Sequence, residues 1–229
     1  MYILHIGNKN YSSWSLRPWI LLQQLGMPFE ERLHRFGDEA DWSQYRSISP
    51  NGKVPCLQDG STTVWDSLGI VEYLADRHPG VWPADANARA WARCAAAEMH
   101  SGFGVLRNDC SMSCGVRIRL HKVGPALQLD INRIDGLWSE GLKRFKGSFL
   151  GGASFSAVDA FYAPVVSRVH TYGLKLSDAA ASYAARIMAL PAMRRWYDAA
   201  LHEPWRDAPH ESDILGSGTL LQDLRAPAS

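Results

Sequence analysis

Four hydroxyl groups lie close together near the start of the chain, in the segment Tyr11-Ser12-Ser13-Trp14-Ser15. A serine between a strand and a helix commonly caps the helix, because its oxygen accepts a hydrogen bond from a backbone N–H group of the first turn. The same hydroxyl could instead donate a hydrogen bond to a bound thiolate and lower the pKa of that thiol, which is ~8.5 in solution. The residues alone leave both roles open.

A second segment with chemical potential is Lys53-Val54-Pro55, which leads into a β-prone run. A proline there can simply begin a strand, where its missing N–H group costs no ladder hydrogen bond. Alternatively, a cis Val54–Pro55 bond would turn the backbone N–H and carbonyl groups of Val54 outward, toward a peptide-like ligand. Both interpretations remain open from the residues.

The pair Asp66-Ser67 opens a third segment with helical character. Ser67 can cap that helix while Asp66 interacts favourably with the positive end of its dipole. The same groups suit a ligand that carries a carboxylate and an ammonium on one carbon, since a helix N-terminus binds the carboxylate and Asp66 the ammonium. A γ-glutamyl group has both charges, and the two roles do not exclude each other.

The elements that must position these three segments lie within residues 1–80. Met1–Gly7 reads as a buried strand, Ser15–Leu25 as a helix and Phe29–Phe36 as a second strand. Asp59-Gly60 marks a hairpin between two further strands, and a helix follows from Ser67. The order predicts a small α/β domain with a mixed four-stranded sheet.

Strand signals disappear after a linker at residues 81–87, and Ala-rich helical patterns follow. We therefore predict an all-helical domain over residues 88–205 and an irregular tail over residues 206–229. The expected helices are Ala88–Leu106, Gly115–Phe145, Ser156–Tyr172, Asp178–Ala189 and Pro191–Leu201.

Composition narrows the class of protein. Hydrophobic residues make up 46% of the 229 residues and charged residues 21%, which is typical of a globular protein. The formal net charge of +1 gives no basic field for nucleic acid or an anionic membrane. The first residues do not read as a signal peptide, and no apolar run approaches the ~18 residues of a membrane span. We expect a cytoplasmic protein without nucleic-acid or membrane partners.

The four cysteines do not predict a metal site. They form no CxxC pair, and no further Cys or His completes a zinc set beside Cys110 and Cys114. We expect four reduced thiols without a metal-binding role.

The order of the three segments resembles the N-terminal domain of the cytosolic glutathione transferases. The turn Tyr11–Trp19 is similar to the serine-containing turn of the zeta and related bacterial classes. In the second half, Ser156 and Asp159 form a capping box of the kind that these transferases carry in a buried helix, where its role is structural. The resemblance covers about residues 1–205 and implies a thioredoxin-like domain followed by a helical bundle.

The resemblance also implies roles for single residues. Ser12 would activate the thiol of the co-substrate glutathione, with Ser13 as the second candidate. Val54 would bind the cysteinyl backbone beside cis-Pro55, and Lys53 would contact the glycyl or backbone part of glutathione. Asp66 and Ser67 would hold the γ-glutamyl end.

The acceptor pocket is expected between the domains, with Phe103, Arg107 and Asn108 as lining candidates. The partner molecules would be glutathione and a small electrophile, and the family implies a homodimer. Trp14 and Leu16 depart from the zeta turn, which has cysteine and tryptophan there, and this argues against maleylacetoacetate isomerisation. A glutathione-dependent isomerase, a peroxidase or a non-catalytic binding protein of the same fold are the alternatives to a detoxifying transferase.

Overall fold

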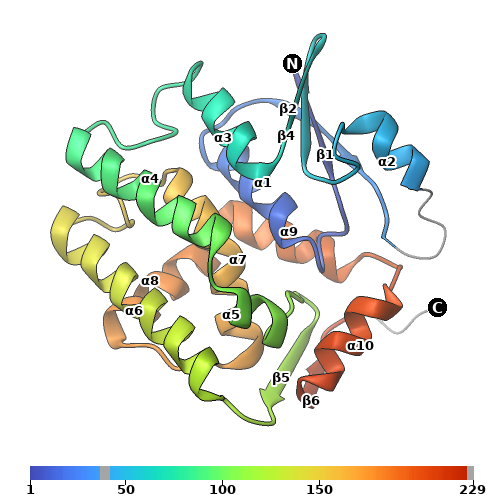
Figure 1. Cartoon of the computed structure of the whole chain (residues 1–229), viewed down its shortest axis with the longest axis vertical. Coiled ribbons are helices and arrows are strands. Elements are labelled where there is room, and N and C mark those ends of the chain that lie inside the picture. The colour runs from blue at the N-terminus through green and yellow to red at the C-terminus, as the bar shows by residue number, and fades with distance from the viewer. Residues whose placement is uncertain (37–41, 226–229) are drawn as a thin grey trace.

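The computed structural model describes residues 1–36 and 42–225. A four-stranded sheet forms the first part of the chain, with the strand order β2-β1-β3-β4 (Figure 1). β1 is parallel to β2, and β3 is antiparallel to both β1 and β4. The strands are β1 Tyr2–Ile6, β2 Phe29–Leu33, β3 Cys56–Asp59 and β4 Thr62–Trp65. The predicted mixed sheet is confirmed, and its topology is thioredoxin-like.

Three helices accompany this sheet: α1 Ser13–Gln24, α2 Trp42–Ile48 and α3 Ser67–Ala75. α1 buries an almost continuous run of side chains, among them Leu16, Ile20 and Leu22, because it packs on α3 on one side and on the helical domain on the other. Gly26 follows α1 with φ of +65°, a conformation in which glycine has no side-chain penalty. The serine turn is therefore the entry to a helix buried between two domains.

The second part of the chain is mainly helical. Its larger helices are α4 Ala86–Ser101, α6 Pro125–Phe145, α7 Ala157–Tyr172, α8 Asp178–Ala189 and α9 Pro191–Leu201. α7 packs against α1, α4 and α8 and is buried almost throughout. Its N-terminus carries the predicted capping box of Ser156 and Asp159.

The predicted helix Ala88–Leu106 is interrupted. α4 ends at Ser101, and a short helix α5 covers Gly104–Asp109. A side chain at Gly102 would approach the carbonyl oxygen of Glu98 to 2.8 Å, and Phe103 adopts a left-handed φ of 56°. This break turns the chain toward the first domain.

The predicted helix Gly115–Phe145 is wrong in its first part, because Val116–Leu120 forms strand β5. Val116, Ile118 and Leu120 alternate with arginines, which is the period of a strand with one buried face. The helix α6 begins only at Pro125, a residue that suits a first helical position.

The prediction of an irregular tail over residues 206–229 is also wrong within the described residues. Ala208–Gly216 forms helix α10 and Gly218–Asp223 forms strand β6, which pairs antiparallel with β5 (Figure 1). Asp207 caps α10 and Pro209 lies in its first turn, which are ordinary start signals. Residues 226–229 of that tail lie outside the described part.

Candidate active site

A cavity of about 780 Å³ lies between the two domains and brings together five of the predicted site residues. These are Ser12, Ser13, Lys53, Val54 and Arg107. The other lining residues are Tyr11, Trp14, Phe36, Tyr45, Gly52, Ser111, Met112, Arg168, Asp207, Pro209 and His210. Residues from at least five separate parts of the sequence therefore meet at one site.

The serine turn forms one wall of this cavity. Ser12 stands at the N-cap of α1, yet no side chain of the described residues caps that helix. The Ser12 hydroxyl instead donates to Ser15 Oγ at 2.7 Å, and Ser15 Oγ accepts the backbone N–H of Gly7 at 3.1 Å. Helix capping by the serine side chain is thus not observed, and the positive end of α1 faces the cavity uncapped.

Ser13 is the first residue of α1 and is largely buried. Within residues 1–36 and 42–225 its hydroxyl has no hydrogen-bond partner, although it lines the cavity. A ligand can therefore use the Ser13 hydroxyl directly, whereas Ser12 must exchange its bond to Ser15.

The loop before β3 contributes a second wall. The Val54–Pro55 peptide bond is cis, as the sequence suggested. Val54 and Lys53 line the cavity, and Pro55 is buried behind them. The Lys53 backbone N–H donates to Asn51 Oδ1 at 3.0 Å, which fixes the loop.

Asp66 and Ser67 do not line the cavity but lie close to the serine turn. Asp66, not Ser67, caps α3, since its carboxylate accepts the N–H of Leu68 at 2.7 Å. Ser67 is buried, and its hydroxyl accepts a hydrogen bond from Arg17 at 3.2 Å. Asp66 Oδ2 lies 3.6 Å from His100 Nε2.

Arg17 links this pair to the serine turn. Its guanidinium lies 4.0 Å from the ring centroid of Trp14 and is almost fully buried. Burial, together with Arg168 and Arg107 nearby, lowers the pKa of Arg17 to about 9. Its Nε atom has no hydrogen-bond partner in the described part of the chain. The charges around the turn are therefore predominantly positive.

Arg107 and Arg168 bring two further cations to the cavity wall. Arg168 donates to the carbonyl oxygen of Cys110 at 2.7 Å and to that of Pro164 at 3.1 Å. Arg107 donates to the carbonyl oxygens of His100 and Gly102. Neither guanidinium lies within ion-pair distance of a described carboxylate, although Asp130 acts on Arg107 at longer range, so a ligand anion would meet net positive charge.

Two of the acceptor candidates do not line this cavity. Phe103 is buried in the hydrophobic core, and Asn108 is exposed on α5. Phe103 precedes α5 as its N-cap residue in a left-handed conformation, and Asn108, next to Arg107 on α5, lies on another side of the helix.

The C-terminal segment supplies a wall that the sequence prediction missed. Asp207, Pro209 and His210 line the cavity from the start of α10. Glu203 accepts the backbone N–H groups of Lys9 and Asn10 at 2.6 and 3.3 Å, so this segment also holds the chain that leads into the serine turn. The Asp-Ala-Pro start of α10 was the available signal for an ordered element here.

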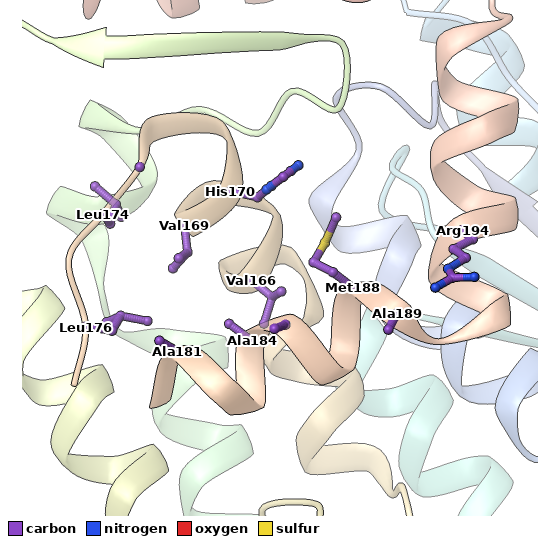
Figure 2. Close-up of a pocket in the computed structure, with 12 residues that line it drawn as sticks. Val166, Val169, His170, Leu174, Leu176, Ala181, Ala184, Met188, Ala189 and Arg194 are labelled. Atoms are coloured by element: carbon purple, nitrogen blue, oxygen red, sulfur yellow. The ribbon is translucent and has the colours of Figure 1, made fainter. Parts of the chain in front are cut away.

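A second hollow, of about 580 Å³, lies between α7 and α8 (Figure 2). Figure 2 shows Val166 and Val169 facing Ala184, with His170 and Arg194 at the margin. It contains none of the predicted site residues. The candidate chemistry is therefore in the interdomain cavity.

Metal-binding clusters and membrane-spanning helices are both absent from the described residues. No group of three or more His, Cys, Asp or Glu side chains there could hold a metal ion. Among the helices that the structure describes, none combines the length and apolar character required to cross a bilayer.

A thioredoxin-like domain joined to a helical domain, with a serine turn at the cavity between them, defines the class of glutathione-dependent transferases. Family models agree in both halves: the glutathione S-transferase N-terminal domain matches residues 11–77 and the C-terminal domain matches residues 123–199. The chain belongs to the glutathione S-transferase family.

Individual relatives support this assignment. The glutathione S-transferase-like protein OpS6 of Beauveria bassiana is 28% identical over 176 residues, which span 70% of this chain and 76% of that protein. A zeta-class glutathione S-transferase of Euphorbia esula is 27% identical over 159 residues, 68% of this chain and 71% of the relative.

A solved structure supports the fold. The glutathione transferase homologue from Burkholderia gl BGR1, solved with bound glutathione, superimposes with a TM-score of 0.64 at 24% identity. The match covers 87% of this chain and 97% of that one.

Proposed function

We propose that this transferase activates the thiol of glutathione at the serine turn and directs the thiolate onto a small electrophile. The observation that carries the proposal is the uncapped N-terminus of α1, with Ser12 and Ser13 beside it on the cavity wall. A thiolate there gains a hydrogen bond from a hydroxyl and the favourable field of the helix end, and both lower its pKa.

The remaining parts of glutathione fit the neighbouring segments. We place the cysteinyl backbone against Val54, whose N–H and carbonyl groups make no hydrogen bond with the described residues. The γ-glutamyl end would lie against Asp66 and Ser67, where Arg17 orients the Ser67 hydroxyl. Lys53 would then meet the glycyl carboxylate.

The acceptor side of the cavity favours an electrophile that carries a carboxylate. Arg107 and Arg168 are its two cations, and among the described residues no carboxylate lies within ion-pair distance of either. An anionic substituent would take the place of the missing counter-ion.

The proposal is tested by steady-state kinetics of the purified chain with glutathione and 1-chloro-2,4-dinitrobenzene. Loss of one hydrogen bond to a charged sulfur is worth about 1.5–3 kcal/mol, so alanine at the effective serine should lower kcat/KM roughly tenfold or more at neutral pH. Ser12→Ala and Ser13→Ala are compared, with Ser101→Ala on the exposed end of α4 as the control. Unchanged kinetics in both single variants and in the double variant would refute the assignment.

The same preparation separates the alternative reactions. Turnover of an organic hydroperoxide or of maleylacetone, without transfer to the chloro-aromatic acceptor, would identify a peroxidase or an isomerase. Absence of glutathione binding by calorimetry at millimolar concentration would indicate a non-catalytic binding protein. The homodimer stays a prediction from the family resemblance, and the cytoplasmic location stays a prediction from the sequence pattern. Light scattering tests the homodimer.

A further inference from the structure

His210 and Asp207 form a carboxylate–imidazole pair at the start of α10. Asp207 is buried, and its Oδ2 atom is hydrogen-bonded to His210 Nδ1. It also accepts the backbone N–H of His210 at 3.3 Å. A carboxylate only accepts hydrogen bonds, so Nδ1 carries the hydrogen of this pair and Nε2 is the nitrogen at which a proton can be taken up or released.

Two aromatic rings fix the imidazole. Tyr11 stacks on it with ring centroids 5.1 Å apart, and Phe36 stacks at 5.5 Å. Tyr11 is itself held, since its hydroxyl accepts a hydrogen bond from Arg225 at 2.7 Å and bonds to Glu211. Because Tyr11 directly precedes Ser12, the imidazole is fixed relative to the serine turn.

The Nε2 atom of His210 remains available. The side chain is 37% exposed, it lines the cavity, and Nε2 has no partner among the residues that the structure describes. The ionisable groups that share this cavity or face the imidazole are Tyr11, Tyr45, Lys53, Arg107, Arg168, Asp207 and, on α10, Glu211. Imidazole is the one group of this set whose ordinary pKa lies near neutrality.

We propose that His210 is a catalytic acid–base residue, positioned by Asp207, that serves the addition of glutathione to activated alkenes such as α,β-unsaturated carbonyl compounds. The inference rests on the proposed function, because it needs glutathione at the serine turn. It adds a catalytic group to that function.

The proton balance of the reaction explains the need for such a group. As the sulfur–carbon bond forms, the alkene π pair moves onto the carbonyl to give an enolate, and the α-carbon must then gain a proton. The serine turn releases the proton of the glutathione thiol to solvent in both reactions. His210 Nε2 takes up a proton from solvent and delivers it to the α-carbon, so the proton count of thiol plus alkene is restored in the adduct. Nothing is oxidised and nothing leaves. Displacement of chloride from an aromatic ring needs no proton on the product, so the imidazole is dispensable there.

The test compares these two reactions in one variant. For His210→Gln we expect kcat/KM with the enone trans-4-phenyl-3-buten-2-one to fall on the order of 100-fold, at least about tenfold more than kcat/KM for transfer to 1-chloro-2,4-dinitrobenzene falls. His202→Gln is the matched control, because His202 also lies 3.6 Å from an aspartate, Asp198, but on an exposed surface. Asp207→Asn retains a helix cap and the imidazole, and it should also slow the enone reaction selectively.

Product stereochemistry adds a readout that a structural role would not change. In D2O the wild type should place deuterium on one face of the α-carbon, whereas His210→Gln should give both faces by proton NMR. Retention of enone turnover and of facial selectivity in His210→Gln would overturn the proposal, and so would an equal loss of both reactions in His210→Gln and Asp207→Asn. A wild type that transfers glutathione to neither acceptor would instead contradict the proposed function.

Discussion

Asp159 offers a stability prediction that can be worked from the structure. Its carboxylate is fully buried at the start of α7 and accepts four hydrogen bonds. The donors are the N–H of Leu150 at 3.0 Å, the N–H of Ser156 at 2.9 Å, the hydroxyl of Tyr183 at 3.0 Å and the hydroxyl of Ser156 at 3.4 Å. Asp159→Ala would leave the two N–H groups and the Tyr183 hydroxyl buried without this partner.

The expected cost at neutral pH is about 3 kcal/mol or more, because each unsatisfied buried donor costs about 1–3 kcal/mol. The cost should also depend on pH. Burial raises the pKa of Asp159 from 3.8 to about 6, against the opposing effect of its hydrogen bonds. A carboxyl group whose pKa is higher in the folded than in the unfolded state adds to the free energy of unfolding when it is protonated. For Asp159 this addition is complete below the unfolded pKa of 3.8 and is lost as the pH rises through about 6.

The measurement is urea unfolding of wild type and Asp159→Ala at pH 4.5 and pH 7.5, followed by fluorescence and circular dichroism. A rise of the pKa from 3.8 to about 6 is equivalent to about 3 kcal/mol below pH 3.8. Because pH 4.5 lies above the unfolded pKa, the penalty should be larger at pH 4.5 than at pH 7.5 by about 2 kcal/mol. Asp178→Ala, an exposed acid in the first turn of α8, is the control. A penalty no larger than that of the control, or one that grows with pH, would refute the reasoning.

Three further outcomes are expected. Gly141→Ala should destabilise the protein by about 1–3 kcal/mol, because a Cβ atom would lie 2.5 Å from the Trp91 ring. Gly136→Ala in the same helix should stabilise the protein by about 0.5–1 kcal/mol, because a Cβ atom there meets nothing within 4 Å. Thermal unfolding of the two variants distinguishes these outcomes. Lys53→Ala should raise KM for glutathione about two- to fivefold at low salt, and the difference should shrink as salt is added. Arg168→Gln should lower the preference for a carboxylate-bearing electrophile over a neutral analogue roughly tenfold or more, and an unchanged preference would remove Arg168 from the acceptor site.

The thioredoxin-like half was readable from sequence because its signals are local. The hairpin at Asp59-Gly60 and the stop at Gly26 are each defined by a few neighbouring residues. The cis Val54–Pro55 bond was suggested only in combination with its flanking motifs. Whether the Ser12 side chain caps α1 could be decided only from coordinates, because capping and thiol activation would use the same residue at the same place.

The missed features depend on contacts between distant parts of the chain. β5 and β6 pair across about 100 residues, so neither strand was evident alone. His210 enters the cavity only because Glu203 and Arg225 bind the segment that leads into the serine turn. Phe103 and Asn108 were misplaced since the break after α4, at Gly102, changes which face of α5 meets the cavity.

The uncapped serine turn of α1 is the centre of this account, and the thiol pKa of bound glutathione tests it most directly. Thiolate absorbance of the saturated complex is titrated against pH for the wild type, Ser12→Ala, Ser13→Ala and the double variant. We expect the wild-type complex to titrate well below the ~8.5 of a free thiol, and the double variant to titrate about one to two pH units higher while still binding glutathione. A double variant whose bound thiol titrates at the same pH as the wild type would contradict the assignment of thiol activation to this turn.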